Sequence, residues 1–262
     1  MNTQGNNPIQ KYLNKIIQGD CLEVMKGLPD KSIDMILCDL PYGTTACSWD
    51  TIIPFEPLWE QYKRIIKDNG AIVLMGTQPF TSVLIMSNLD MFKYTWVWNK
   101  KAVSNPFLGK IQPLRITEDI CIFSKGKTNY YPKMEIRGKM RKKGTRFILK
   151  NDNFVDGNGG RGLDTRSYNN SYYPKNIIDI TNANRRGKIH PTQKPVELFL
   201  YLIETYSKEN DTVLDNCIGV GTTAFACKLI NRNFIGIELE EKYCKIAEDR
   251  LRQEVLDLAP SK

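Results

Sequence analysis

The chain has 262 residues, of which 41% are hydrophobic and 25% are charged, and its mean hydropathy is −0.39. This composition excludes disorder over most of the chain, and the length suits one large α/β domain, alone or with an insert. No apolar run reaches the roughly 18–20 residues of a membrane helix. The polar N-terminus lacks the apolar core of a signal peptide. We therefore expect a cytoplasmic protein that has no membrane partner.

The predicted elements, in chain order, alternate short apolar runs with helical patterns. This alternation predicts an α/β fold with a mostly parallel sheet and helices on both of its faces. The segment 126–189 breaks the rhythm, because it is rich in Gly, Asn, Arg, Lys and Tyr and has no clear period. We interpret it as an irregular insert. The expected strands are 15–18, 33–38, 71–75, 94–98, 119–123, 212–214 and 234–238, and the expected helices are 21–26, 55–66, 79–87, 195–206, 223–231 and 241–258.

The positive charge is concentrated in this same central region. The net charge is +8, but residues 125–188 carry 16 Lys and Arg against 5 Asp and Glu, whereas the remainder carries 21 basic and 24 acidic residues. A patch of one sign attracts a partner of the other sign, so the sequence indicates nucleic acid. A solvated basic surface is the alternative interpretation.

The cysteines and the single histidine do not form a recognisable site. The seven cysteines are an odd number, and none of them forms a CxxC pair. This pattern predicts buried thiols in a reducing compartment, with neither a disulfide framework nor a zinc ribbon. His190 is the only histidine, and no cluster of His, Cys and acidic residues indicates a metal, so we expect no metal ion.

A glycine-containing turn near the C-terminus is the first candidate site. A strand that ends at Asp215 is followed by a turn with Gly219 and Gly221 and then by a helix, and the next strand ends at Glu238. Glycines allow a ligand to approach the backbone closely, and an acid in that position can accept hydrogen bonds from ribose hydroxyls. The pattern predicts either a nucleoside cofactor or tight packing of the strand against the helix. The glycine pattern of nicotinamide-binding proteins is incomplete.

A second candidate site follows the apolar run IDMIL. Here an acid, Asp39, and the backbone carbonyl of Leu40 offer two acceptors for the hydrogens of an exocyclic amino group. Pro41 keeps Leu40 out of the helical conformation, and Tyr42 presents a flat ring on which a base can stack. A plain turn with a capping Asp is the alternative interpretation of these four residues alone.

Three segments together resemble one enzyme family. DLPY (39–42) resembles the [DNS]PP[YFW] motif of S-adenosylmethionine-dependent amino-methyltransferases, and DNCIGVGTT (215–223) is similar to their cofactor loop. HPTQKPVELFLYLI (190–203) is similar to the segment that precedes that loop in the β group of DNA methyltransferases. The order of the segments is the β-group order. The resemblance implies a Rossmann-like, mostly parallel seven-stranded methyltransferase sheet that is circularly permuted and carries an inserted target-recognition region.

The resemblance also implies a domain organisation and a role for each matching residue. Residues 1–125 form the catalytic half, 126–189 the basic target-recognition insert and 190–262 the cofactor-binding half. Asp39 and the Leu40 carbonyl would hold the target amino nitrogen, with Pro41 shaping the turn and Tyr42 stacking on a flipped base. The implied S-adenosylmethionine-binding residues are Asp20, Lys194, Asp215, Gly219, Gly221, Thr222, Thr223 and Glu238. The candidates for phosphate contacts in the insert are Arg137, Arg141, Lys142, Lys143 and Arg146.

The sequence departs from the family pattern at several positions. Leu40 replaces the first proline of the catalytic motif, but a backbone carbonyl survives that change. Asn216 and Cys217 replace Pro-Phe, which removes a ring from the expected cofactor pocket. The segment 117–125 is similar to the strand that carries His-Glu or Glu-Tyr in the family, and no role is assigned to it here.

The predicted function is site-specific methylation of adenine N6 in double-stranded DNA after base flipping, as in restriction-modification systems. Asp39 favours adenine, because the N4-cytosine enzymes of this group more often carry Ser at that position. Cytosine N4 is the main alternative, and a DNA-binding protein with a decayed active site is another. Cytosine C5 chemistry uses a Pro-Cys nucleophile, and this dipeptide does not occur, so Cys47 is not assigned a role. Dimers are common in the family, so a homodimer is also considered.

Overall fold

The computed structural model describes residues 8–43, 50–138, 170–182 and 193–257. The chain folds into two compact units. The larger comprises the described residues up to Tyr131 and those from Lys175 onward, and the smaller lies within Pro132–Pro174. Residues 126–131 and 175–182, which the sequence analysis assigned to the insert, therefore belong to the larger unit.

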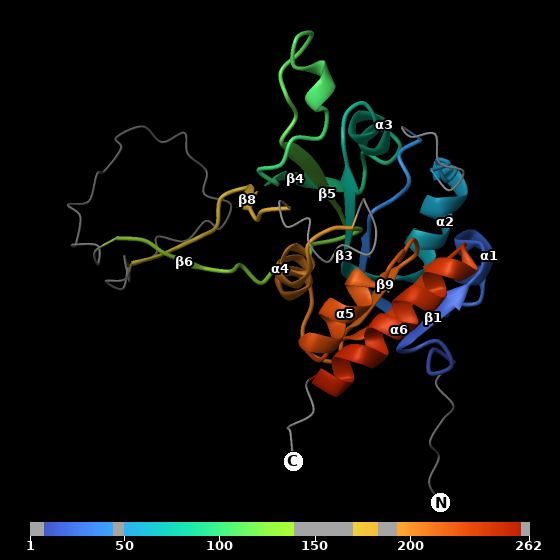
Figure 1. Cartoon of the computed structure of the whole chain (residues 1–262). Coiled ribbons are helices and arrows are strands. Elements are labelled where there is room, and N and C mark those ends of the chain that lie inside the picture. The colour runs from blue at the N-terminus through green and yellow to red at the C-terminus, as the bar shows by residue number, and fades with distance from the viewer. Residues whose placement is uncertain (1–7, 44–49, 139–169, 183–192, 258–262) are drawn as a thin grey trace, which may run out of the picture. The chain divides into compact units, whose positions relative to one another are not determined.

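The larger unit is built on an eight-stranded sheet with the order β1-β10-β9-β2-β3-β5-β4-β8 (Figure 1). All neighbouring strands pair in parallel except β5, which is antiparallel to both β3 and β4. This arrangement confirms the predicted fold class, a mostly parallel α/β sheet. The strands are β1 (Lys15–Gln18), β2 (Ile33–Cys38), β3 (Ile66–Gly76), β4 (Phe92–Asn99), β5 (Thr117–Phe123), β8 (Ile177–Asp179), β9 (Thr212–Asp215) and β10 (Asn233–Glu238).

The strand count differs from the seven that the sequence analysis predicted. Seven strands of this sheet overlap the expected ones, two of them with identical bounds, and the eighth, β8, comes from the segment that was assigned to the irregular insert. β8 has only three residues, and of these only Ile178 is buried. A single buried position gives no alternation that a sequence pattern can detect, whereas β4 supplies an edge with which β8 pairs.

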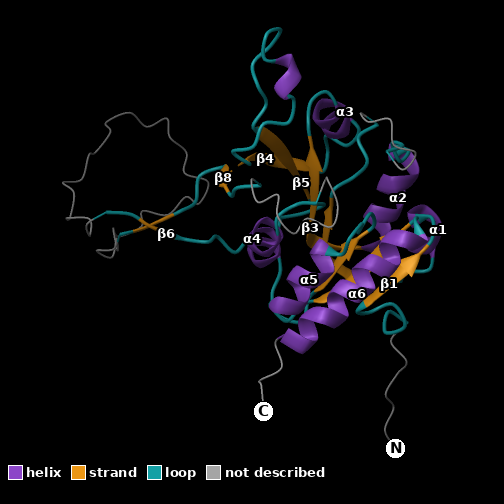
Figure 2. Ribbon diagram, in the orientation of Figure 1, coloured by secondary structure: helices purple, strands orange, loops and turns teal. Residues whose placement is uncertain are grey.

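Helices cover both faces of the sheet (Figure 2). Side chains alternate along β2, so that Ile36 and Cys38 pack into one hydrophobic cluster and Met35 and Leu37 into another. The first cluster contains residues of α1, α2 and α3, and the second contains residues of α4 and α5. The helices are α1 (Cys21–Lys26), α2 (Phe55–Ile65), α3 (Phe80–Met86), α4 (Val196–Tyr206), α5 (Thr222–Leu229) and α6 (Glu241–Asp257), with a short 3₁₀ helix, η1 (Pro106–Leu108).

The parallel strands all end at one edge of the sheet, where α/β proteins bind their ligands. Asp39 follows β2, Asp215 ends β9 and Glu238 ends β10. Because β5 runs in the opposite direction, its first residues lie at this same edge, and Glu118 of β5 pairs with Trp98 near the end of β4. The topology therefore collects acidic side chains from four strands at one end of the sheet.

The smaller unit is described only in part. β6 (Glu135–Ile136) pairs antiparallel with β7 (Ser171–Tyr172). Arg137 forms an ion pair with Glu135, and its guanidinium lies 5.7 Å from the centre of the Tyr172 ring. Four of the five predicted phosphate-contact residues, Arg141, Lys142, Lys143 and Arg146, lie outside the described residues.

No helix among the described residues is long and apolar enough to cross a membrane. These residues also contain no group of three or more His, Cys, Asp or Glu side chains arranged to hold a metal ion.

Candidate active site

A cavity of about 1290 Å³ lies at the edge of the sheet where the parallel strands end. Its volume exceeds the roughly 300–1,000 Å³ of ordinary ligand pockets, so the cavity has room for two groups, each of about the size of a nucleoside or a base. Gly221, which the sequence analysis also selected, does not line it. The predicted site residues that do line it are Asp20, Asp39, Leu40, Pro41, Tyr42, Lys194, Asp215, Gly219, Thr222, Thr223 and Glu238.

The turn between β9 and α5 shapes one part of this cavity. Gly219 and Gly221 both have left-handed backbone conformations, with φ values of +52° and +79°. A Cβ atom on Gly219 would have no neighbour within 4 Å, whereas a Cβ on Gly221 would lie 2.9 Å from the Cβ of Ala247 in α6. Gly221 is therefore required for packing between helices, and Gly219 faces open space within the cavity.

Glu238 is fixed by the same turn. Its Oε2 accepts a hydrogen bond from the Gly219 amide at 2.9 Å, and its Oε1 accepts one from the Glu240 amide at 3.0 Å. Burial raises the pKa of Glu238, and these backbone hydrogen bonds oppose that effect. The carboxylate is thus held in place at the end of β10 before any ligand binds.

Asp215 is buried beneath the turn. Its carboxylate accepts hydrogen bonds from the Thr223 hydroxyl and, at 3.1 Å, from the Cys217 amide. Burial raises the pKa of Asp215 from 3.8 to about 7, although both hydrogen bonds oppose the shift. Asp215 therefore ties β9 to α5, and its charged form is disfavoured by its surroundings.

This pKa predicts how stability depends on pH. Between pH 4 and pH 7 the folded state retains a proton on Asp215 that the unfolded state releases, so stability falls as the pH rises through this window. We expect Asp215→Asn to remove that dependence. As the pH rises through this window, the free energy of unfolding of the variant should therefore increase relative to that of the wild type by up to ~1.4 kcal/mol per pH unit. Urea unfolding at several pH values measures the difference. Asp90→Asn, at an exposed position, is the control. If the unfolding free energies of the wild type and Asp215→Asn differ by the same amount at every pH, the raised pKa of Asp215 is contradicted.

Asp20 begins α1. Its Oδ1 accepts hydrogen bonds from the amides of Leu22 and Glu23, at 2.8 and 3.1 Å. This is the geometry of a helix N-cap. The side chain lines the cavity with one of its oxygens already committed to the helix.

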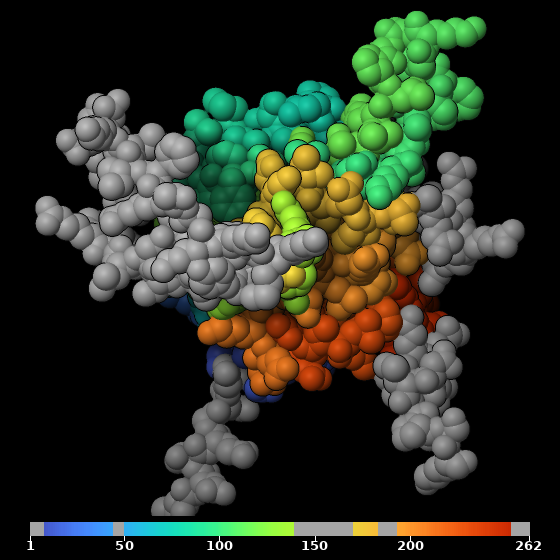
Figure 3. All heavy atoms as spheres, turned by 90° about the vertical axis from the view of Figure 1, so that its left-hand side faces the viewer, coloured from blue at the N-terminus to red at the C-terminus, as the bar shows by residue number. Residues whose placement is uncertain are grey.

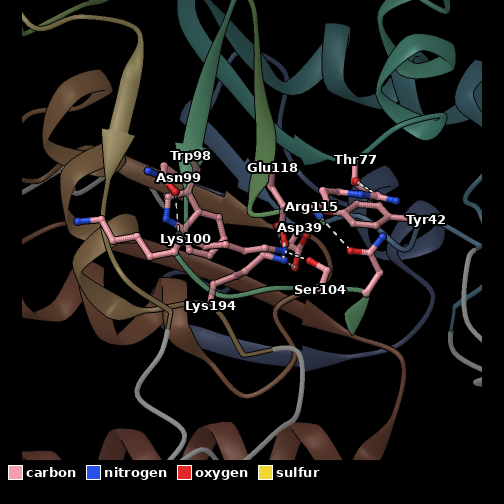
Figure 4. A network of polar contacts seen from close by, with 12 residues as sticks. Asp39, Tyr42, Thr77, Trp98, Asn99, Lys100, Ser104, Arg115, Glu118 and Lys194 are labelled. Carbon is pink, nitrogen blue, oxygen red and sulfur yellow. Dashed lines mark hydrogen bonds and ion pairs between the residues drawn. The ribbon is translucent and has the colours of Figure 1, made fainter. Parts of the chain in front are cut away.

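Asp39 and Tyr42 form the centre of the second part of the cavity (Figure 4). The Tyr42 hydroxyl donates a hydrogen bond to Asp39 Oδ1 at 2.5 Å, and Lys194 Nζ lies 2.9 Å from Asp39 Oδ2. The ring of Tyr42 packs against Phe80, with 5.0 Å between the ring centres. Both oxygens of the Asp39 carboxylate therefore have a donor within the protein.

Lys194 joins Asp39 to a second carboxylate. Its Nζ lies 3.1 Å from Glu118 Oε2, and the other oxygen of Glu118 is 2.6 Å from Lys100 Nζ. The side chains of Lys100, Lys194 and Glu118 are only 9%, 10% and 12% exposed. The charges of two ammonium groups and two carboxylates thus balance in a largely buried network. Lys100 also donates a hydrogen bond to the Ser104 hydroxyl.

The electrostatics of the network follow from this pairing. Burial lowers the pKa of Lys194, but the carboxylates of Asp39 and Glu118 outweigh it, and the net shift is upward. Burial raises the pKa of Glu118, but Lys194 and Lys100 outweigh it, and the net shift is downward. Both groups are therefore charged at neutral pH.

Comparison with known proteins identifies the family. The sequence profile of the DNA methylase family N6_N4_Mtase matches residues 33–249. The chain belongs to this family of S-adenosylmethionine-dependent DNA amino-methyltransferases. It is 31% identical to the Type II methyltransferase M.HinfI of Haemophilus influenzae, over 94% of this chain and 70% of that protein. It is 27% identical to the Type II methyltransferase M1.MboII of Moraxella bovis, over 92% of this chain and 97% of that protein.

Solved structures share the fold of this methyltransferase. The M1.HpyAVI–SAM complex superposes with a TM-score of 0.62 at 23% identity, covering 90% of this chain and 98% of that one. The cytosine-N4-specific PvuII DNA methyltransferase superposes with a TM-score of 0.63 at 16% identity, covering 92% of this chain and 89% of that one. At these identities the likeness establishes the fold of the methyltransferase alone.

Several residues of the methyltransferase's candidate site were not selected from the sequence. Glu118 lies in the strand whose family resemblance was noted without a role, and Lys100 directly follows β4. Arg115 also lines the cavity and donates a hydrogen bond to Thr77. A single charged residue at a strand end carries no signal by itself, because its partners are distant in sequence. His190 and Cys47, which the sequence analysis considered and left without a role, lie outside the described residues.

Proposed function

We propose that this methyltransferase transfers a methyl group from S-adenosylmethionine to N6 of adenine in double-stranded DNA. The observation that carries the proposal is the position of Asp39. Its carboxylate lies in the same cavity as the glycine turn and Glu238, and it is held there by Tyr42 and Lys194. An acid at this position, where N4-cytosine enzymes of the family more often have Ser, favours adenine.

The cofactor fits the residues present. The open space at Gly219 allows a ligand to approach the backbone, and the fixed carboxylate of Glu238 can accept hydrogen bonds from a ribose. Asp20, in the turn after β1, lines the same cavity. When bound, S-adenosylmethionine supplies an electrophilic methyl group on a sulfonium centre. Gly219, Glu238 and Asp20 would hold its nucleoside part, and Asp215 and Thr223 would keep the turn in shape.

Asp39 would act on the amino group of the target base. An exocyclic amino nitrogen is a poor nucleophile, because its lone pair is delocalised into the ring. A carboxylate that accepts a hydrogen bond from the amino group favours the form with a localised lone pair and stabilises the positive charge that develops on nitrogen. This interaction is stronger in the transition state than in the ground state, so it accelerates the reaction. The surplus proton on nitrogen then leaves to solvent.

Tyr42 and Lys194 would hold the carboxylate of Asp39 in position before the base binds. The hydrogen bond from Tyr42 to Asp39 fixes the orientation of the ring, on which the flipped base can stack. Without substrate, the ammonium of Lys194 pairs with Asp39 Oδ2, the oxygen to which the amino group of the base would donate. When the base displaces Lys194 from this oxygen, Lys194 keeps its ion pair with Glu118.

The two glycines of the cofactor turn allow a matched pair of substitutions. Gly219→Ala introduces a methyl group into open space, so we expect a cost of about 1–2 kcal/mol for the backbone conformation and a cofactor affinity about tenfold weaker, which is ~1.4 kcal/mol. Gly221→Ala adds a clash with Ala247, so its loss of stability should be larger by roughly 1–3 kcal/mol. Urea unfolding and calorimetric titration with S-adenosylmethionine measure both effects. Equal stabilities of the two variants would contradict the assignment.

The proposed substrate is tested by transfer of radiolabelled methyl groups. The purified protein is incubated with labelled S-adenosylmethionine and unmethylated duplex DNA, single-stranded DNA or RNA of matched sequence. We expect the label in duplex DNA, with a second incubation of the fully methylated product adding none. Label in RNA alone would refute the proposal. Binding of DNA without binding of the cofactor would show a decayed enzyme.

A further inference from the structure

We propose that the excursion between β4 and β5, residues 101–116, is a DNA-binding arm whose Phe107 inserts into the duplex beside the target base. The inference rests on the proposed function, since it concerns how that site receives its base. The arm is distinct from the basic segment between residues 125 and 188, where the sequence places the target-recognition region.

The arm exposes apolar side chains that the rest of the larger unit leaves uncovered. Phe107 is 96% exposed and Ile111 is 79% exposed. Leu108 and Leu114, in the same excursion, are also exposed. Figure 1 shows this green segment extending beyond the ends of β4 and β5, and in Figure 3 it projects from the surface. Exposed apolar clusters of this kind mark interaction sites, because leaving them in water is unfavourable.

The arm is held in shape by its own hydrogen bonds. The Ser104 amide donates to the Arg115 carbonyl, and the Arg115 amide donates to Asn105 Oδ1, each at 3.0 Å. Within the tip, the amides of Leu108 and Ile111 donate to the carbonyls of Asn105 and Leu108, at 3.1 and 2.9 Å. A preformed tip presents Phe107 without a further cost of ordering on binding.

The charge of the arm fits a polyanion. Residues 100–116 contain Lys100, Lys101, Lys110 and Arg115 and no acidic residue. Lys101 precedes Phe107 in the sequence and Lys110 follows it, and both lysines are exposed, whereas Lys100 is buried in its ion pair with Glu118. Exposed lysines near an apolar side chain fit DNA, whose phosphates lie beside its stacked bases.

The root of the arm belongs to the catalytic cavity. Ser104, Asn105 and Arg115 line the same cavity as Asp39 and Tyr42. A base that enters this cavity must come from a duplex lying against its mouth, next to the arm. A flipped base leaves a gap in the stack, and an apolar side chain that fills this gap compensates part of the free-energy cost of unstacking.

The test measures the affinity for DNA of Phe107→Ala, with Leu229→Ala, at a 40% exposed position in α5, as the matched control. Fluorescence anisotropy is recorded with a fully paired duplex and with a duplex in which the target base is mismatched. We expect Phe107→Ala to bind the paired duplex at least about tenfold more weakly and to recover most of this loss on the mismatched duplex, because a mismatched base flips at lower cost. Its affinity for S-adenosylmethionine should match that of the wild type.

Wild-type affinity of Phe107→Ala for the paired duplex would overturn the proposal. So would an equal loss on both duplexes together with a change from dimer to monomer in sedimentation, because the arm would then bind a second copy. This experiment measures DNA affinity and not methyl transfer, so its outcome is independent of the test of the proposed function. Arm-dependent binding without methyl transfer would support the arm and refute the activity.

A second pair of variants tests the charge of the arm. Replacing Lys101 and Lys110 together with Gln should reduce the slope of log affinity against log salt by about 1.8, since each phosphate contact contributes about 0.9. The control replaces Lys26 and Lys245 with Gln, two lysines that are 59% and 68% exposed on helices. A slope equal to that of the control would contradict DNA contact by the arm.

Discussion

Asp39→Ala lowers the rate of methyl transfer by about 10²–10³-fold, the effect of removing one preorganised group that stabilises transition-state charge. Its affinities for DNA and S-adenosylmethionine should stay close to those of the wild type. The structure gives the reason, since the carboxylate lies in the cavity and is 26% exposed, and Lys194 keeps Glu118 as a partner when Asp39 is removed. Single-turnover transfer of labelled methyl groups measures the rate, and anisotropy and calorimetry measure the two affinities.

The conservative variant and a surface control sharpen this test. Asp39→Asn retains one oxygen acceptor, so its rate should lie between those of Asp39→Ala and the wild type. Asp68→Asn changes an exposed acid that pairs with Lys31 and should leave the rate unchanged. If Asp39→Ala loses DNA affinity in proportion to its activity, then Asp39 acts in binding, and the role assigned to it is wrong.

Glu118→Gln lowers the free energy of unfolding by about 3–5 kcal/mol, because it removes the charge that compensates two buried ammonium groups. Lys100 is 9% exposed, and Glu118 is the carboxylate with which it pairs in the described part of the chain. The double variant with Lys100→Met should recover part of the loss, since it also removes the uncompensated charge. Urea unfolding of the wild type, both single variants and the double variant completes the cycle.

The pH dependence of the same cycle follows from the lowered pKa of Glu118. A depressed pKa contributes stability above the unfolded value of about 4.3, and this contribution is lost as the pH falls through the folded value. The variants that carry Gln at 118 should therefore lose less stability than the wild type on acidification below pH 4. Glu23→Gln, in an exposed pair with Lys26, serves as the control. Wild-type stability of Glu118→Gln would contradict the account of the buried network.

The order of elements could be predicted from the sequence because each is a local pattern. The apolar run 33–38 is followed directly by an acid, and the carboxyl ends of parallel strands meet at one edge of a sheet. Asp39, Asp215 and Glu238 could therefore be placed together before the structure was known. β1, β2 and α1 have the bounds that the pattern predicted.

The partners within the site could not be predicted in the same way. Glu118 reaches Lys194, and through it Asp39, only because β5 runs against the other strands. Nothing in the sequence of β5 specifies its direction. The double role of Asp20 as a helix cap depends on the local conformation of the chain. The exposure of Phe107 is likewise a tertiary property, since an apolar residue between two strands is as often buried.

Identification of the methylated nucleoside tests the central claim most directly. Unmethylated DNA is incubated with the protein and with S-adenosylmethionine whose methyl group carries a stable isotope, then digested to nucleosides and examined by mass spectrometry. The proposal predicts labelled N6-methyladenine, which the Asp39→Ala variant forms about 10²–10³-fold more slowly. Labelled N4-methylcytosine in its place would contradict the assignment of adenine, and the absence of any labelled nucleoside would contradict the activity itself.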